Sequence, residues 1–264
     1  KTTGVLHGWA PISGGYSIEL AIPWSNLGIT PTAGMTLGFS VGYNDDDNGG
    51  GREGQAIWRG TADNWMNTSA LGNIVLGADP NLITVPYTST NLTVDGNVSE
   101  SDWNIATDVS KTVIGTTNNT TTFGVLWDNT YLYVGMKVLD DTLYNDSTYV
   151  HEDDSVEIYI DGDHNHGTTY DSYDRQFVKG WNDSTLGEKH GRTTGVLHGW
   201  SPIPGGYSIE LSIPWSNLGI TPTAGMTLGF SLGYNDDDNG SGREGLAVWF
   251  GTANNNLDTS AFGG

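Results

Sequence analysis

The sequence predicts an all-β protein, a β-sandwich or jelly roll of antiparallel strands that is tandemly repeated with a 191-residue period. Three observations predict this fold class. Apolar residues recur at intervals near two along several short segments, which is the period of a half-buried strand. Clusters of Gly, Asn and Asp, typical of turns, separate these segments at short intervals. One stretch of the chain occurs twice, and no long amphipathic helix interrupts the pattern.

The repeated stretch indicates how the chain is organised. Residues 1–73 align without a gap to residues 192–264, and 15 of the aligned positions differ. Such identity at one fixed offset marks a tandem duplication. We expect three parts: the C-terminal part of one sandwich repeat (1–73), a linker with the start of the next repeat (74–90), and a complete sandwich (91–264).

The partial repeat carries a further expectation. Lone strands leave edges and apolar faces exposed, so half a domain cannot bury its core alone. We expect the chain to be a piece of a longer tandem-repeat protein. Residues 1–73 are then completed by upstream sequence, by another copy of the chain or by the next repeat.

The expected strands of the complete repeat follow in chain order. The segments 123–128 and 130–140 flank the Asp128–Asn129 turn and predict a hairpin. In "DSVEIYID" (154–161), Val, Ile and Ile alternate with Ser, Glu and Tyr. In "GGYSIELSIPW" (205–215), the strand ends at Pro214, which has no N–H for the ladder.

The remaining segments complete the expected sandwich. After Pro214, "PWSNLG" is expected to form one helical turn. The segment 226–236 forms another strand, which runs into the acidic loop "NDDDNG" (235–240). The segment 245–250 forms the last one.

Composition excludes several classes of partner and site. Ten basic residues stand against 31 acidic ones, giving a formal net charge of −21. This balance argues against nucleic acid, whose binding needs clustered Lys and Arg, and it suits divalent cations. The chain has no Cys, which excludes disulfides and zinc–thiolate sites, and no stretch long and apolar enough for membrane insertion.

The density of N-x-Ser/Thr sequons favours an extracellular or cell-surface protein. Such motifs are the acceptors of N-glycosylation in secreted proteins, although a chain rich in Asn, Ser and Thr gains many of them as ordinary turn chemistry. The candidate glycosylation sites are Asn67, Asn91, Asn97, Asn118, Asn119, Asn145, Asn182 and Asn239.

An ordered set of motifs resembles carbohydrate-binding module family 9. The set comprises "TVDGNVSESDWNIA" (93–106), "VLWDNTYLYVGMKVLDD" (125–141), "HEDDSVEIYIDGD" (151–163), "RQF" (175–177), "GGYSIELSIPW" (205–215) and "LGFSLGYNDDD" (228–238). The resemblance implies a sandwich of two antiparallel sheets, structural calcium, and recognition of the ends of sugar chains between two tryptophans.

The resemblance implies a set of sugar-binding positions, which can be assigned in this sequence residue by residue. Glu157 and Gln176 match the polar positions of the family's site. The first tryptophan position is occupied by His151. The second is occupied by Asn256 in the complete repeat and by Trp65 in the partial repeat, and Val178 stands where the family usually has an arginine. Tyr149 and Trp181 are the aromatic candidates to replace the missing rings, because an aromatic face stacks on the apolar face of a sugar.

Three acidic loops are candidate calcium sites, since calcium takes six to eight hard oxygen ligands. The resemblance places ligands around the first loop, at Asp140, Asp146, Glu152 and Asp154. The second loop has the alternate-residue spacing that opens many calcium loops, at Asp161, Asp163 and Asn165. The third offers Asp236 and Asp238. For each loop, a hydrated polar turn is the alternative interpretation.

The motifs that are absent favour a binding protein over an enzyme. The sequence has no nucleophile elbow, no phosphate loop and no single carboxylate pair that stands apart from the metal-like clusters. We therefore expect a non-catalytic, calcium-stabilised module that binds a polysaccharide or glycan. The alternative is a structural subunit of an extracellular filament, sheath or surface layer, with other copies of the chain as partners.

Overall fold

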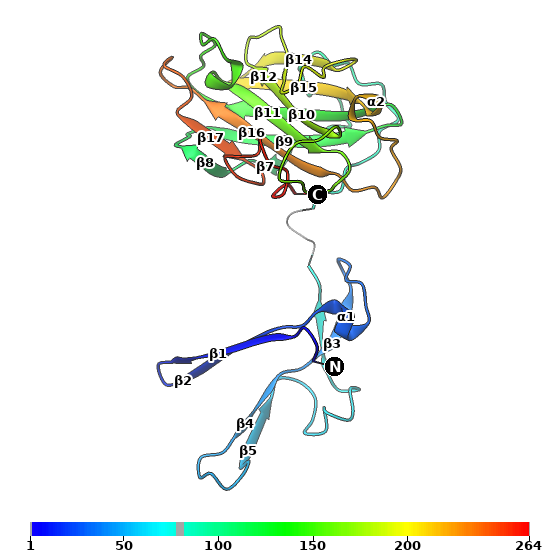
Figure 1. Ribbon diagram of the computed structural model, residues 1–264, viewed down its shortest axis with the longest axis vertical. Helices are drawn as coiled ribbons and strands as arrows, with labels where there is room; N and C mark the ends of the chain where they lie inside the picture. Colours follow the sequence, from blue (N-terminus) through cyan, green and yellow to red (C-terminus); the bar gives the residue numbers. More distant parts are fainter. Residues whose placement is uncertain (1, 78–81, 264) are drawn as a thin grey trace. The chain divides into compact units, whose positions relative to one another are not determined.

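The computed structural model of the chain describes residues 2–77 and 82–263, and it divides into two compact units, Lys1–Pro80 and Asn81–Gly264. Strands dominate both units (Figure 1), which confirms the all-β, antiparallel fold class. The division falls inside the stretch that the sequence predicts as a linker.

The second unit is a β-sandwich of two antiparallel sheets. One sheet has the order β14-β15-β10-β9-β7 and the other has the order β13-β12-β11-β16-β17-β8. The first sheet comprises β7 (Thr107–Asp108), β9 (Thr120–Trp127), β10 (Tyr131–Leu139), β14 (Leu197–Ile203) and β15 (Gly206–Pro214). The second comprises β8 (Lys111–Gly115), β11 (Ser155–Asp161), β12 (Asp174–Gly180), β13 (Gly187–Glu188), β16 (Gly229–Asp236) and β17 (Gly245–Val248).

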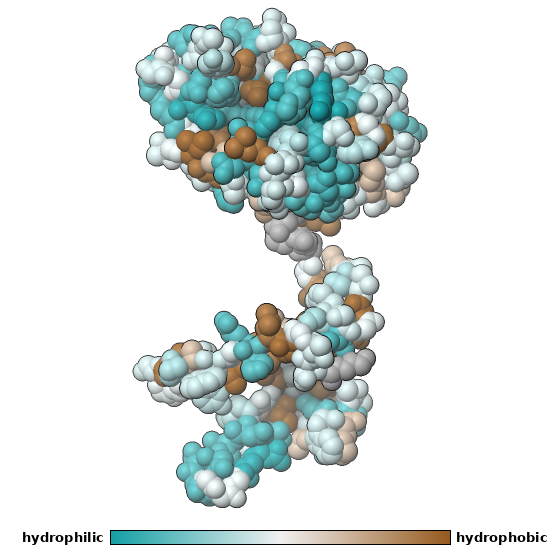
Figure 2. All heavy atoms as spheres, in the orientation of Figure 1, coloured by the Kyte–Doolittle hydropathy of each residue, from teal (hydrophilic) through white to brown (hydrophobic). Residues whose placement is uncertain are grey.

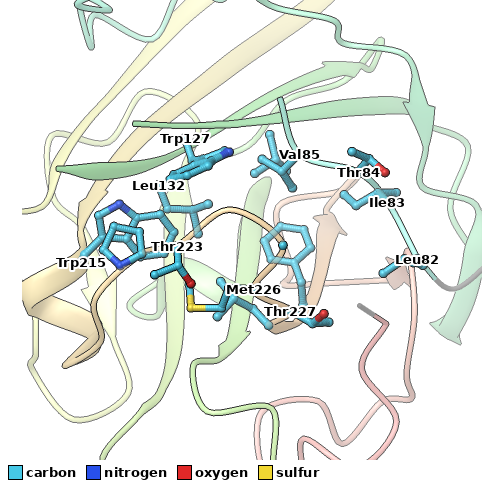
Figure 3. A pocket seen from close by; sticks show the side chains of 15 residues that line it. Leu82, Ile83, Thr84, Val85, Trp127, Leu132, Trp215, Thr223, Met226 and Thr227 are labelled. Carbon is cyan, nitrogen blue, oxygen red and sulfur yellow. The ribbon is translucent and has the colours of Figure 1, made fainter. Parts of the chain in front are cut away.

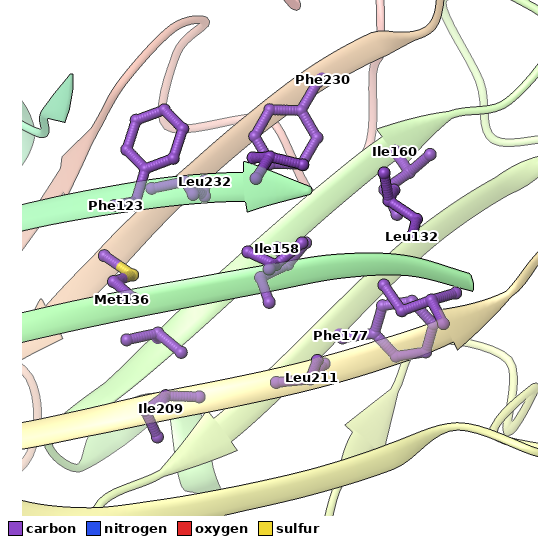
Figure 4. Packing of buried hydrophobic residues seen from close by; sticks show 14 of the residues in the cluster. Phe123, Leu132, Met136, Ile158, Ile160, Phe177, Ile209, Leu211, Phe230 and Leu232 are labelled. Atoms are coloured by element: carbon purple, nitrogen blue, oxygen red, sulfur yellow. The ribbon is translucent and has the colours of Figure 1, made fainter. Parts of the chain in front are cut away.

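The core lies between these two sheets, as Figure 4 shows. Val156, Ile158 and Ile160 project from β11 toward Ile209 and Leu211 of β15, and all five are at most 1% exposed. Both strands are also buried on their outer faces, because loops cover the Ser, Glu and Tyr side chains there. Alternation in the sequence therefore identifies the core face correctly, but the opposite face is not solvated.

Most of the predicted strand positions are confirmed, with one correction. The 123–128 and 130–140 hairpin is β9–β10, and Pro214 ends β15 before the short helix α2 (Trp215–Leu218). The strand predicted at 226–236 begins only at Gly229. Residues 226–228 are not strand because they have no ladder partner, and the Met226 amide instead donates to the Thr223 carbonyl in a turn.

Residues 2–77 of the first unit form three two-stranded sheets. The elements are β1 (Leu6–Ile12) with β2 (Gly15–Ala21), β3 (Thr36–Phe39) with β6 (Gly72–Val75), β4 (Gly42–Asp45) with β5 (Gly54–Ile57), and the helical turn α1 (Trp24–Leu27). Among residues 2–77, none is buried. Apolar residues therefore lie at the surface of this unit, as the brown spheres in Figure 2 show.

The repeat places nearly identical strands in two environments. β2 reads "GYSIELA" and is exposed at all seven positions, whereas the matching residues of β15 are buried or half-buried. In the second unit, β15 pairs with β14 on one edge and β10 on the other, and β11 and β16 face it across the core. The difference in burial comes from these partners and not from the strand's own sequence.

Candidate functional site

A polar cleft of about 600 Å³ opens on the outer face of β11 and β12 in the second unit. The short 3₁₀ turn η1 (Val150–Glu152) forms one wall, and loops around Lys189, Arg243 and Asn256 form the others. Tyr149, His151, Glu157 and Gln176, all predicted as sugar-binding positions, line this cleft. The structure thus brings together residues that are up to 27 positions apart in sequence.

Glu157 is held by several hydrogen bonds within the cleft. Its carboxylate is 3% exposed and accepts hydrogen bonds from Tyr159 Oη (2.6 Å), Gln176 Nε2 (2.7 Å) and Asn235 Nδ2 (2.9 Å). Arg243 Nη1 lies 3.7 Å from the same carboxylate. Burying a carboxylate is tolerated only when it is paired and hydrogen-bonded, and these partners meet that need. The network also fixes the direction in which each polar group faces the cleft.

An aromatic pair stands at the rim. The rings of Tyr149 and His151 are stacked, with centroids 5.8 Å apart and an interplanar angle of 27°. Tyr149 is 66% exposed, so most of its surface is free to contact a ligand. Asn256 also lines the cleft, and its backbone carbonyl accepts a hydrogen bond from Lys189 Nζ.

Two predicted aromatic residues lie elsewhere. Trp181 packs edge-on against Trp200, with ring centroids 6.3 Å apart, and does not line the cleft. Trp65 belongs to the first unit, where it is 78% exposed beside a shallow depression lined by Gln55 and Asn64.

Two basic residues of the cleft were missed by reasoning from the sequence. Arg243 comes from the "GREG" loop and reaches the carboxylate of Glu157, while Lys189 comes from β13's neighbouring loop. Val178, which stands where an arginine was expected, also lines the cleft. The repetition of "GREG" in both copies was the available signal, but it does not tell which strand the arginine contacts.

In the part of the chain that the structure describes, nine aspartates gather into three clusters, in each of which carboxylate oxygens lie within 4.8 Å of one another. The clusters are Asp140–Asp236–Asp238, Asp146–Asp153–Asp237 and Asp161–Asp163–Asp174. Six of these nine residues were predicted as metal ligands, and Asp153, Asp174 and Asp237 were not. The first two clusters join residues from separate loops, which the linear spacing alone could not show, whereas the third lies within the single connection between β11 and β12.

The other predicted ligands lie beside the clusters. Asp154 accepts hydrogen bonds from the backbone amides of Tyr144 (2.6 Å) and Asp237 (3.3 Å), and so lies beside the second cluster. Asn165 donates its amide to Asp163 (3.1 Å). Glu152 instead contacts His151, at 3.3 Å.

The electrostatics of these clusters suit a cation. Burial raises the pKa of Asp154 to about 8, and burial raises those of Asp236 and Asp174 to about 6. Buried oxygens of Asp140, Asp174, Asp237 and Asp238 have no hydrogen-bond donor among the described residues. Crowded hard oxygens with unsatisfied lone pairs are the donor set that calcium takes, so the residues present fit such an ion.

A family model described as "Carbohydrate family 9 binding domain-like" matches residues 1–78 and 94–264. The chain belongs to this family. The resemblance found from the motifs is thereby confirmed, and the matched residues cover most of both units. Family 9 domains are non-catalytic carbohydrate-binding modules.

Relatives and solved structures agree with this assignment. The chain is 32% identical over 253 residues to endo-1,4-beta-xylanase A of Thermoanaerobacterium saccharolyticum and to exoglucanase XynX of Acetivibrio thermocellus. Each alignment covers 94% of this chain but only 21% and 23% of the two relatives. The chain therefore spans about a fifth of the length of these relatives.

A family 9 module from Caldicellulosiruptor kristjanssonii, solved in complex with cellotriose, is similar over 68% of this chain and 89% of that one. The TM-score is 0.61 and the identity 27%. A family 9 module from the same organism, solved in complex with glucose, gives a TM-score of 0.61 at 25% identity and covers 68% of this chain and 92% of that one. In this family 9 chain, none of the helices in the described ranges is long and apolar enough to cross a membrane.

Proposed function

We propose that the second unit binds the ends of polysaccharide or glycan chains, without catalysis, in the cleft around Glu157. The observation that carries the proposal is the fixed set of polar groups beside an exposed aromatic face. Sugar hydroxyls both donate and accept hydrogen bonds, and the carboxylate, amide and guanidinium of Glu157, Gln176 and Arg243 offer both kinds of partner. Tyr149 supplies a face for the apolar side of the ring.

The relatives support glucose-based ligands as the first to test. Family 9 modules from Caldicellulosiruptor kristjanssonii were solved with cellotriose and with glucose, and the matching enzymes are named as a xylanase and an exoglucanase. We infer an extracellular setting, since cellulose and xylan lie outside cells and the sequence is rich in sequons.

Isothermal calorimetry with cellotriose and xylotriose tests this function. We expect submillimolar affinity for at least one of them, and a loss of at least tenfold in Glu157→Gln, because the amide removes the charge that organises Arg243. Asp108→Asn, on the exposed edge strand β7, is the matched control and should bind normally. If the wild type shows no affinity for glucan, xylan or other glycans on an array, the proposal fails.

We also propose that calcium occupies the acidic clusters. Asp140, Asp236 and Asp238 would hold one ion, and the other two clusters would each hold another. A bound ion would supply the positive charge that these carboxylates lack and would join the loops that carry them. The unpartnered buried oxygens support this assignment over a hydrated turn.

The alternative function, a subunit of an extracellular assembly, is favoured by one observation. Trp9, Ile18 and Leu20 lie on one face of the β1–β2 hairpin and are each at least 60% exposed, and contiguous apolar patches of this kind mark interaction surfaces. Sedimentation velocity tests it. Filaments that a chelator dissolves, together with no affinity for sugars, would favour the assembly over the binding module.

A further inference from the structure

An apolar groove of about 240 Å³ lies in the second unit, away from the sugar cleft. Figure 3 shows Trp127 and Trp215 at one end of it and Leu82 to Val85 along another side. The segment Gly225–Phe230, which leads into β16, forms the remaining wall. None of the residues proposed for sugar or calcium binding takes part.

The first unit contains the counterpart of the wall segment 225–230, and there it is paired with a neighbouring strand. Residues 34–39 and 225–230 both read "GMTLGF". In the first unit, β3 pairs antiparallel with β6, with Leu37 opposite Ile74 and Phe39 opposite Gly72. The pairing extends one step further, because the amide of Leu76 donates to the carbonyl of Met35 at 2.9 Å and the amide of Gly34 donates to Leu76 at 2.9 Å.

Among the described residues of the second unit, only the first step of this ladder is present. Phe230 forms an isolated antiparallel bridge with Gly263, and its amide donates to the Gly263 carbonyl at 2.7 Å. Gly263 is the repeat counterpart of Gly72, so the bridge has the same register as Phe39 with Gly72. Beyond this step, Met226 is 36% exposed.

The strand that fills this position in the first unit has side chains that suit the groove. Along 73–76, Asn73 and Val75 are exposed whereas Ile74 and Leu76 are half-buried, so the two apolar side chains on one face point inward. The groove offers apolar surfaces to that face, namely the rings of Trp127 and Trp215 and the side chain of Val85.

We propose that the groove is a strand-acceptor site, whose ligand is an extended segment with the sequence of Gly72–Leu76. The segment adds antiparallel to residues 225–230 in the register that the Phe230–Gly263 bridge sets. Main-chain hydrogen bonds hold it, and the inward Ile and Leu side chains give specificity, as in other cases of β-strand addition.

A capped peptide with the sequence of residues 72–77, "GNIVLG", is the probe, and the whole chain is the receptor. We expect saturable one-to-one binding that changes the fluorescence of Trp127 and Trp215. Amide hydrogen exchange should slow at least tenfold at the groove-side residues of 225–228. The same peptide with Asp in place of its Ile and Leu should bind at least tenfold more weakly.

A pair of variants localises the effect. Met226→Asp should weaken peptide binding at least tenfold, whereas Met35→Asp, the same change in the first unit, should leave it unchanged. Protection of 225–228 that rises with protein concentration without peptide would identify β6 of a second copy as the bound strand. No slowing of exchange at saturating peptide, or equal binding of the Asp-containing peptide, would overturn the proposal.

Discussion

Asn256 occupies the position in the cleft at which the other copy of the repeat has Trp65. A tryptophan there would add a further aromatic face to the cleft that Tyr149 and His151 also line. We expect Asn256→Trp to raise the affinity for cellotriose about fivefold, because an aromatic contact contributes about 1 kcal/mol beyond its buried area. Calorimetry measures the change.

The reciprocal substitution is the control for this experiment. Trp65→Asn places the second unit's residue in the first unit and should leave the affinity for cellotriose unchanged. A loss of binding in this variant would instead assign the sugar site to the first unit.

Glu210 is a second residue whose surroundings determine its behaviour. It lies on β15 and is fully buried, and its Oε2 accepts hydrogen bonds from the amides of Asp95 (3.1 Å) and Gly96 (3.3 Å). Burial, and next the charge of Glu100, raise the pKa of Glu210 to about 7. The folded state therefore favours the protonated form of this group.

This shift predicts a dependence of stability on pH. The pKa is about 7 in the folded state against 4.5 ordinarily, so folding binds a proton between these values and the free energy of unfolding falls as pH rises through them. The loss is on the order of 3 kcal/mol at most. We expect Glu210→Gln to make this slope shallower in urea unfolding measured from pH 4.5 to 8, while the raised pKa values of Asp154, Asp174 and Asp236 keep part of it.

Glu19→Gln is the matched control, since Glu19 is the exposed counterpart in β2. It should keep the slope of the wild type. Parallel pH profiles for wild type and Glu210→Gln would contradict the assignment of the slope to this carboxyl.

At the scale of elements, β2 and β15 have almost the same sequence but different surroundings, so comparing them shows the effect of burial alone. Leu211 in β15 is 0% exposed, and its counterpart Leu20 in β2 is 64% exposed. We expect Leu211→Ala to lower the free energy of unfolding by about 2–5 kcal/mol, because it leaves a cavity in the core. Leu20→Ala should change it by less than about 0.5 kcal/mol. Chemical denaturation followed by tryptophan fluorescence measures both.

The same contrast explains which elements the sequence could predict. Alternation and Pro214 were enough to place β11 and β15, because both carry strong apolar periodicity. β8 and β13 have no such period and were not predicted, since they are short edge strands formed by pairing with β17 and β12. The start of β16 was predicted too early, because the residues of a strand do not reveal which neighbouring strand pairs with them.

The site follows the same pattern. Glu157 and Gln176 could be predicted from the family's motif, and both line the cleft. Arg243 and Asp237 could not, because their roles depend on loops that the fold brings beside β11. Local sequence determines the type of each group, and the tertiary structure determines its partner.

At the scale of the whole molecule, an excess of 21 negative charges must be accommodated. If the acidic clusters bind calcium in the folded state only, the ion stabilises the protein by mass action. At a concentration one hundred times the dissociation constant, each site adds about 2.7 kcal/mol. Differential scanning calorimetry should therefore show a lower unfolding midpoint in excess EDTA than in millimolar calcium.

Two comparisons make this measurement specific. Excess magnesium should restore the midpoint less well than calcium, since magnesium demands a stricter octahedral geometry. Asp238→Asn should reduce the response to calcium by removing one ligand of the first cluster. An unfolding midpoint that does not change on addition of EDTA would reject structural calcium.

The near-identity of β2 and β15 also makes them competitors while the chain folds. β10 must select β15, although β2 offers almost the same residues to its edge. The two loops to be closed differ by less than a factor of two in length, and a twofold difference changes the closure free energy by only about 0.6 kcal/mol. Proximity along the chain thus discriminates poorly, and faithful folding depends on the few positions at which the copies differ, such as Ala21 against Ser212.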